Sequence, residues 1–189
     1  MAFDIQKLTL NDAFVIDYFS VKDPRGNFSK CFEKDIYRNF GIEFELNETF
    51  FSSSCSNVIR GIHFQTYKPQ AKIVCVPKGR VWDVLVDLRK DSTTYLNWEG
   101  IELSENNHKA LYVPKGFGHA FLSLEDGTLM VYQCEGAYDK NTDTGIRFDD
   151  SVIGIKWPVD LKNTSHSDRD LSFCDYNEAL KKGILDFVY

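Results

Sequence analysis

The sequence lacks three features that would each indicate a broad class of protein: an excess of positive charge, a long apolar run and a leader segment. Its 189 residues include 22 Lys and Arg against 28 Asp and Glu, for a formal net charge of −6. Nucleic-acid-binding proteins usually present a basic face, so we expect no nucleic-acid partner. No uninterrupted apolar stretch approaches the ~18 residues of a membrane-spanning helix. The opening residues, MAFDIQKLTL, contain neither a basic n-region nor an apolar h-region, so we expect a cytoplasmic protein without a membrane segment.

Closely spaced cysteine pairs are absent as well. The five cysteines are scattered along the chain without a CxxC pair, which favours reduced thiols over disulfides or a metal cluster. What the sequence does contain is 43% hydrophobic and 14% aromatic residues, enough to bury a large core. No repeat or linker interrupts it, so we expect a single domain over residues 1–189.

Short apolar segments separated by glycine-containing turns dominate the chain. Residues 80–88 alternate with one fully apolar face, which is typical of a strand, and Asp83 and Asp87 on the other face are expected to be solvated or paired. Strands at intervals of roughly 8–12 residues predict an antiparallel sandwich or barrel. We therefore predict a mainly β protein of the jelly-roll type, the double-stranded β-helix of cupins, with short helices near both ends. Strands are expected within 12–32 around a turn at 23–27, within 58–76, and at 80–88, 98–103, 110–113, 119–124 and 129–138, with helices at 34–40 and from 175 or 177 to 187.

The stretch from Val58 to Val76, VIRGIHFQTYKPQAKIVCV, mixes charged and apolar residues most closely. Polar side chains on core strands must face a cavity or be paired, because burying one unpaired costs ~1–3 kcal/mol. Under strict alternation, Arg60 and His63 lie on opposite faces of a strand. They share a face only if a bulge or a bend at Gly61 interrupts the strand. This conflict indicates a site rather than ordinary packing.

Two other segments are open to more than one interpretation. Phe50 and Phe51, followed by three serines, fit either a strand with stacking aromatic rings or an ordinary core edge, and we favour the core. Arg25, at the tip of a turn, is most simply a solvated charge.

A metal site is the first chemistry to consider in a small β-barrel with histidines. The run PKGFGHAF delivers His119 at the position that a metal-binding cupin offers from its second motif. The first motif would need HxH and a downstream glutamate, but Gln65 stands where the second histidine belongs and residues 66–74 contain no acid. Two imidazoles without a carboxylate or a third histidine are a poor site for a first-row metal, so we expect no metal.

Proton transfer at carbon suits the remaining polar residues better. Removing a proton beside a ketone needs a base, such as a histidine near neutral pH, and a cation such as lysine to hold the enolate charge. A tyrosine can return the proton, and a carboxylate can fix the histidine tautomer. On spacing alone, a residue such as a lone histidine or tyrosine is more often an ordinary core side chain. The candidates are His63, Lys72, His119, Tyr132, Tyr138 and Asp170.

Several longer motifs carry more information than the spacing. They are VIRGIHFQ (58–65), QAKIV (70–74), GRVWDV (79–84), VDLR (86–89) and PKGFGHAF (114–121), together with DPRG (23–26), residues 132–138, IKWP (155–158) and SDRD (167–170). In one register over residues 20–172, this set resembles the dTDP-4-dehydrorhamnose 3,5-epimerase family. The resemblance implies a metal-free cupin fold without a cofactor, usually a homodimer. It also implies inversion of C3 and C5 in nucleotide-linked 4-keto-6-deoxy sugars, as part of activated-sugar biosynthesis for surface polysaccharide.

The resemblance further implies a role for each matched position. His63 would be the base, oriented by Asp170, while Lys72 would hold the enolate at the 4-keto oxygen and Tyr132 would be the acid. This assignment replaces the solvated interpretation of Arg25. The substrate-contacting positions would be Tyr138 in the sugar pocket and Arg25, Arg60 and Arg169 at the diphosphate, with His119 nearby.

Three positions depart from the family pattern. Lys30 stands where a glutamate is usual, and Glu48 and Phe50 stand where a glutamine and an asparagine are usual. Because these positions help to hold the nucleoside, a GDP-linked 4-keto-heptose is an alternative substrate, with Phe50 or Phe51 stacked on the base. Epimerisation at C3 alone is another alternative. Two further interpretations are a non-catalytic sugar-nucleotide-binding cupin and a metal-dependent cupin oxygenase or isomerase.

Overall fold

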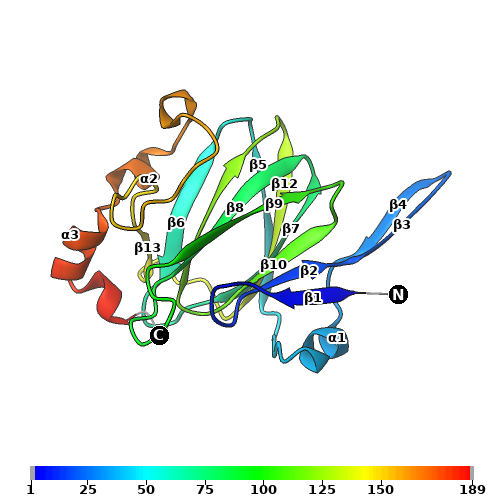
Figure 1. Ribbon diagram of the computed structural model, residues 1–189, viewed down its shortest axis with the longest axis horizontal. Helices are drawn as coiled ribbons and strands as arrows, with labels where there is room; N and C mark the ends of the chain where they lie inside the picture. Colours follow the sequence, from blue (N-terminus) through cyan, green and yellow to red (C-terminus); the bar gives the residue numbers. More distant parts are fainter. Residues whose placement is uncertain (1–2, 188–189) are drawn as a thin grey trace.

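Two antiparallel β-sheets face each other in the computed structural model, which describes residues 3–187 (Figure 1). One has six strands in the order β1–β2–β10–β7–β12–β5, and the other has five in the order β13–β6–β11–β8–β9. The prediction of a mainly β jelly-roll architecture is confirmed. The strands are β1 (Asp4–Lys7), β2 (Phe14–Asp17), β3 (Phe19–Asp23), β4 (Gly26–Lys30), β5 (Glu48–Ser54), β6 (Ile59–Gln65), β7 (Ala71–Lys78), β8 (Arg80–Asp87), β9 (Trp98–Ser104), β10 (Lys109–Val113), β11 (Phe117–Ser123), β12 (Thr128–Glu135) and β13 (Asp143–Gly145).

The side chains of β8 alternate between two apolar layers. Val81 and Leu85 pack between the sheets, while Val84 and Val86 pack beneath the C-terminal segment on the outer face of the five-stranded sheet. The two aspartates of this strand, both fully buried, are paired rather than solvated. Asp83 binds His119 through both carboxylate oxygens, and Asp87 accepts hydrogen bonds from Arg89, Ser92 and Thr94.

The short helices lie outside the sheets (Figure 1). They are α1 (Lys34–Asn39), α2 (Asp168–Ser172) and α3 (Tyr176–Lys181), with the 3-10 turns η1 (Leu161–Asn163) and η2 (Ile184–Phe187). The predicted helix at 34–40 is confirmed. The helix predicted to run to 187 is wrong in length, because Gly183, at a φ of +68°, separates α3 from η2. The strand predicted over 129–138 is also too long: β12 ends at Glu135, before Gly136 with a φ of +85°.

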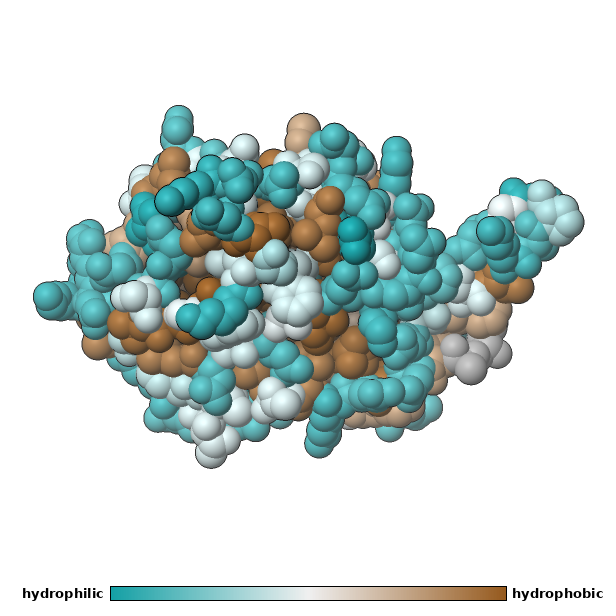
Figure 2. Space-filling view, turned by 45° about the horizontal axis from the view of Figure 1, so that its top comes forward, coloured by the Kyte–Doolittle hydropathy of each residue, from teal (hydrophilic) through white to brown (hydrophobic). Residues whose placement is uncertain are grey.

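Strands β3 and β4 form a separate two-stranded ladder, which we call the arm. The arm projects from one side of the body, and Figure 2 shows it standing clear. Two of its apolar side chains are exposed, Val21 by 49% and Phe28 by 60%. An isolated two-stranded hairpin is only marginally stable in water, so contacts within its own chain stabilise the arm only weakly.

The core interpretation of Phe50 and Phe51 is wrong. β5 is an edge strand of the six-stranded sheet, and the two rings are 43% and 73% exposed. Hydrophobicity alone does not distinguish an edge strand from a central one. The five cysteines form no disulfide. None of the helices within residues 3–187 is long and apolar enough to span a bilayer.

Candidate active site

A bulge in β6 brings Arg60 and His63 to one face of the strand. On the neighbouring strand β11, His119 pairs with His63 and Phe121 pairs with Arg60. Two steps along β11 thus match three along β6, so β6 carries one extra residue within Gly61–Ile62. Since His119 and Phe121 share a face of β11, their partners share that face too. The bulge that the alternation conflict predicted is confirmed.

His63 is held by a carboxylate from a distant segment. Its Nε2 lies 2.7 Å from Oδ1 of Asp170 on α2. Ser167 caps that helix by accepting a hydrogen bond from the backbone N–H of Asp170 at 3.1 Å, which places the Asp170 side chain inward, with the residue only 3% exposed. Because Nε2–H is donated to the carboxylate, the lone pair on Nδ1 is available to accept a proton.

The environment of Asp170 keeps its carboxylate charged. Burial by itself raises the pKa of this group, but hydrogen bonds from His63, the Gly61 backbone and Ser167 outweigh burial and hold the pKa below its ordinary value. A charged carboxylate fixes the imidazole tautomer and stabilises the imidazolium that forms when His63 takes a proton.

Lys72 and Tyr132 project from the facing, six-stranded sheet. Tyr132 of β12 pairs with Val74 of β7, and Lys72 pairs with Cys134, so Lys72 and Tyr132 lie on one face. Burial lowers the pKa of Lys72, and nearby acidic groups act on its ammonium only at a distance. Burial raises the pKa of Tyr132. The phenol therefore stays protonated, while the ammonium loses its proton more easily than that of a free lysine.

These side chains line one cavity of about 190 Å³. His63 reaches it from the five-stranded sheet, and Lys72 and Tyr132 reach it from the six-stranded sheet. Ser52 and Phe121 were missed by the sequence analysis, although strand alternation places each on the same face as a residue two positions earlier, Phe50 and His119 respectively. The lining residues are Phe50, Ser52, Arg60, His63, Lys72, His119, Phe121 and Tyr132.

A second histidine–carboxylate pair forms part of the same wall. Nε2 of His119 lies 2.9 and 3.0 Å from the two carboxylate oxygens of Asp83. The His119 ring meets Tyr132 edge-on, with ring centroids 6.0 Å apart. His119 thus lies beside the phenol, deep in the cavity, since only 5% of it is exposed. Within residues 3–187, no three His, Cys, Asp or Glu side chains converge as metal ligands would.

Phe50 packs directly on the tyrosine. The two rings stack with centroids 4.6 Å apart and an interplanar angle of 13°, as their cross-strand pairing between β5 and β12 requires. One face of Phe50 is therefore occupied by Tyr132. Phe51 points to the opposite side of β5 and does not line the cavity.

Three of the predicted substrate-binding residues lie beside the cavity rather than in its lining. Tyr138 is 55% exposed and donates a hydrogen bond to Asp143 at 3.1 Å. Arg169 forms an ion pair with the same carboxylate at 2.6 Å. Glu48 accepts a hydrogen bond from Nε2 of Gln70 at 2.9 Å.

Arg25 is separated from these residues altogether. It lies at the tip of the arm, its side chain is 91% exposed, and it pairs with Asp23 at 2.6 Å. The side chain of Lys30, at the base of the arm, forms an ion pair with Glu33. The structure therefore does not bring Arg25 to the cavity of its own chain.

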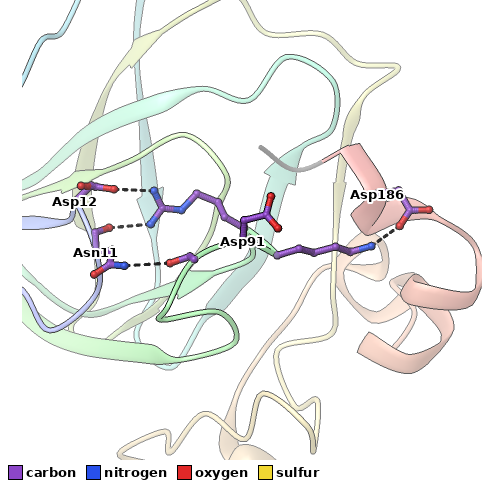
Figure 3. Close-up of a pocket in the computed structure, with 7 residues that line it drawn as sticks. Asn11, Asp12, Asp91 and Asp186 are labelled. Carbon is purple, nitrogen blue, oxygen red and sulfur yellow. Dashed lines mark hydrogen bonds and ion pairs between the residues drawn. The ribbon is translucent and has the colours of Figure 1, made fainter.

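A larger, open cavity of about 530 Å³ lies elsewhere (Figure 3). Its lining contains no histidine, cysteine or tyrosine. Arg89 donates to Asp12 at 2.9 Å, and Lys90 is paired with Asp186, so both cations are already neutralised. These contacts tie the loop after β8 to neighbouring segments and offer no group for proton transfer at carbon.

Comparison with known proteins agrees with the geometry of the smaller cavity. A family model described as dTDP-4-dehydrorhamnose 3,5-epimerase matches residues 7–178. The chain belongs to the dTDP-4-dehydrorhamnose 3,5-epimerase family. The resemblance drawn from the motifs is thereby confirmed, as is the prediction that the chain is an enzyme of the epimerase class.

Members of the family with similar sequences or structures come from several organisms. The chain is 41% identical over 155 residues to the dTDP-4-dehydrorhamnose 3,5-epimerase of Methanothermobacter thermautotrophicus, covering 82% of this chain and 84% of that one. A 4-keto-6-deoxy sugar epimerase from the novobiocin gene cluster of Streptomyces spheroides superposes with a TM-score of 0.91 at 32% identity, covering 97% and 92%. A 3'-monoepimerase from Streptomyces bikiniensis, solved with dTDP-quinovose, gives a TM-score of 0.86 at 30% identity, covering 94% and 90%.

Proposed function

We propose that the chain inverts C3 and C5 of a 4-keto-6-deoxy sugar linked to thymidine diphosphate, and so supplies activated sugar for surface polysaccharide. The observation that carries this proposal is the placement of His63 and Tyr132 on facing sheets around one cavity. An epimerase must remove a proton from one side of a sugar carbon and return one to the other side. A base and an acid on opposite walls meet that requirement without moving the substrate.

Each inversion needs two proton transfers. Nδ1 of His63 takes the proton from C3, the C–H electrons form a C3–C4 double bond, and the carbonyl electrons move to O4. The ammonium of Lys72 stabilises the resulting enolate. Tyr132 then gives its phenolic proton to C3 from the opposite face, and the C4 carbonyl re-forms. Solvent restores both groups, and the same cycle at C5 completes the reaction.

The diphosphate and nucleoside fit outside this cavity. Ligand pockets usually have volumes of ~300–1,000 Å³, whereas this cavity has about 190 Å³, which suits the sugar ring alone. Arg60 is exposed at the cavity and is steadied by hydrogen bonds to Ser54 Oγ at 3.1 Å and to the Ser53 carbonyl at 3.3 Å. It would supply local positive charge for the diphosphate in a chain with a net charge of −6, and Arg169, whose charge is shared with Asp143, would add to it.

The arm supports a homodimer as the working form. Its Val21 and Phe28 are exposed on an arm that projects away from its own body (Figures 1 and 2), so a second copy of the chain is where we expect them to be covered. Arg25 at the arm tip would then serve the diphosphate site of the partner. This arrangement reconciles the expected role of Arg25 with its distance from the cavity of its own chain.

Isotope exchange tests the proposed chemistry. Incubation in D2O with a panel of dTDP-, GDP- and CDP-linked 4-keto sugars is expected to place deuterium at both C3 and C5 of a dTDP-linked substrate. Label at C3 alone would instead identify a monoepimerase. No label with any substrate, together with unchanged nucleotide-sugar affinity in His63→Ala, would reject the enzymatic proposal in favour of a binding module.

A further inference from the structure

Two cysteines meet on the outer face of the six-stranded sheet, at the base of the arm. Cys31 is the first residue after β4, and Cys75 lies within β7. Val74 and Val76, the neighbours of Cys75, pack between the sheets, so Cys75 faces outward. It is only 7% exposed, and Cys31 packs against the same apolar cluster. The two side chains are joined by a hydrogen bond from the Cys75 thiol to the Cys31 sulfur.

Two buried tyrosines hold this pair in place. The Tyr37 hydroxyl of α1 donates a hydrogen bond to the Cys31 carbonyl at 2.6 Å, and the phenols of Tyr37 and Tyr18 both lie near the two sulfurs. Burial raises the pKa of each phenol, so both tyrosines remain protonated. Cys31 is partly exposed, which leaves its sulfur accessible to a small molecule.

The hydrogen bond makes the two sulfurs chemically unequal. Because the Cys75 thiol is the donor, the bond lowers the pKa of Cys31 against the effect of burial. The same bond and burial together raise the pKa of Cys75. Cys31 therefore ionises first, and the thiolate is the nucleophilic form of cysteine. Cys31 is thus the sulfur that attacks an oxidant, and Cys75 is the thiol in contact with it that can complete a disulfide.

We propose that Cys31 and Cys75 form a site of reversible oxidation, at which hydrogen peroxide converts the two thiols into a disulfide between the base of the arm and β7. The Cys31 thiolate attacks one peroxide oxygen, the O–O bond breaks, and a sulfenic acid and hydroxide form. The hydroxide takes the Cys75 proton and leaves as water.

The Cys75 thiolate then completes the reaction. It attacks the Cys31 sulfur, the S–S bond forms, and the S–O bond breaks to release a second hydroxide, which becomes water by taking up the proton that Cys31 had lost. In total, two thiols are oxidised to one disulfide and one peroxide is reduced to two waters. A thiol such as glutathione reverses the change by exchange. The inference does not depend on the proposed epimerase reaction.

The disulfide would fix the arm to the body covalently. In the reduced protein the arm is a two-stranded hairpin, which is only marginally stable by itself. A cross-link between distant residues restricts the unfolded chain, so we expect the oxidised protein to melt roughly 5–15 °C higher. Lys72 lies on the opposite face of β7 from Cys75, so oxidation should leave kcat within about twofold.

Peptide mapping of the full chain tests the site directly. After treatment of the reduced protein with hydrogen peroxide, two of the five thiols should be lost first, with a mass decrease of two hydrogen atoms. The tryptic peptides that contain Cys31 and Cys75 should be joined, and dithiothreitol should restore both the thiols and the original melting temperature. In Cys75→Ala, a sulfenic acid at Cys31 should instead be trapped by dimedone.

The matched control is Cys55→Ala, which removes an exposed cysteine outside the pair and should leave the cross-link and the rise in melting temperature intact. Loss of other thiols before Cys31 and Cys75, or a disulfide that joins two chains through Cys55 in place of this link, would overturn the inference. A complete cross-link with an unchanged melting temperature would overturn the fixing of the arm. The mapping uses the unsubstituted chain, so its result depends neither on the folding of a variant nor on turnover of any substrate.

Discussion

Lys72 lies in an environment that disfavours its charged form. Its ammonium lies against the cavity, and burial lowers its pKa. Among residues 3–187, the acids around it act on it without a hydrogen bond. A lysine kept without an ion pair in a cavity is more costly than a paired one, and such groups are typical of functional sites. Its free ammonium suits a developing oxyanion.

Activity is predicted to fall at high pH because Lys72 loses its proton. The group must be charged to hold the enolate, and its lowered pKa means that it becomes neutral at a lower pH than the ~10.4 of a free lysine. The alkaline limb of kcat against pH should therefore lie below that value. Lys72→Met should lower kcat about 10²–10³-fold. Tyr132→Phe should leave the limb where it is, and a limb that moves with Tyr132 would contradict this assignment.

Tyr132 is predicted to be needed for inversion but not for exchange. In Tyr132→Phe, His63 still removes the proton and can return a solvent-derived one to the same face. Epimerisation should fall about 10²–10⁴-fold, while deuterium from D2O still enters C3 without inversion. His63→Ala should lose both processes. Loss of exchange in Tyr132→Phe to the level of His63→Ala would show that the tyrosine acts before, not after, the enolate.

At the scale of elements, the bulge in β6 decides which residues meet. Regular alternation would have separated Arg60 from His63, and one extra residue within Gly61–Ile62 unites them. The sequence predicted the strands and the need for an interruption in β6, because the two-residue alternation of a strand is visible in neighbouring positions. It did not predict Asp143, which lies on a strand of three residues too short to show a pattern, nor the exposure of Phe51, which depends on β5 being an edge. The partnership of Asp170 with His63 came from the family resemblance, since no local pattern connects residues 107 positions apart.

Gly61→Ala is predicted to disrupt the bulge and the site together. Gly61 has a φ of +123°, and an added Cβ would lie 2.5 Å from the Ala120 Cβ and 2.7 Å from the His119 carbonyl oxygen. The strained φ should cost ~1–3 kcal/mol and the overlap another ~1–3 kcal/mol. Chemical denaturation measures the loss of unfolding free energy.

A matched glycine separates these two costs. Gly26 has a similar φ of +130° but no atom within 4 Å of an added Cβ, so Gly26→Ala should lose only the ~1–3 kcal/mol of the strained φ. Equal losses in Gly26→Ala and Gly61→Ala would show that the close packing of β6 on β11 does not matter. Activity assays of Gly61→Ala should also show a fall in kcat, because Arg60 and His63 would no longer share a face.

At the scale of the whole molecule, the arm is the element whose apolar side chains its own chain leaves exposed. It carries exposed apolar side chains and the diphosphate candidate Arg25 away from the body (Figure 1). In the proposed homodimer, the apolar side chains of the arm and Arg25 contact the partner subunit. Val21→Ser combined with Phe28→Ser should weaken self-association in analytical ultracentrifugation, whereas Leu180→Ser, at an exposed position on α3, should not.

Mixing two inactive variants tests whether Arg25 acts across the dimer. Arg25→Ala should bind substrate weakly, and His63→Ala should lack the base. If Arg25 serves the partner, a mixed dimer contains one site with both groups intact, so co-expression of the two variants should restore activity that neither has alone. Arg25 acting on its own chain would give no restoration.

The contact between His63 and Asp170 also has a consequence for how the enzyme matures. A single bridge between Val58 and Ser165, with Ile59 N–H bonded to the Ser165 carbonyl at 3.0 Å, ties the segment before α2 to the start of β6. Asp170 follows the last strand, β13, by 25 residues, so the proposed base acquires its carboxylate partner only when this later segment docks on the sheets. Under the proposed mechanism, turnover therefore requires the docking of the segment around α2 and not only the completion of the sheets.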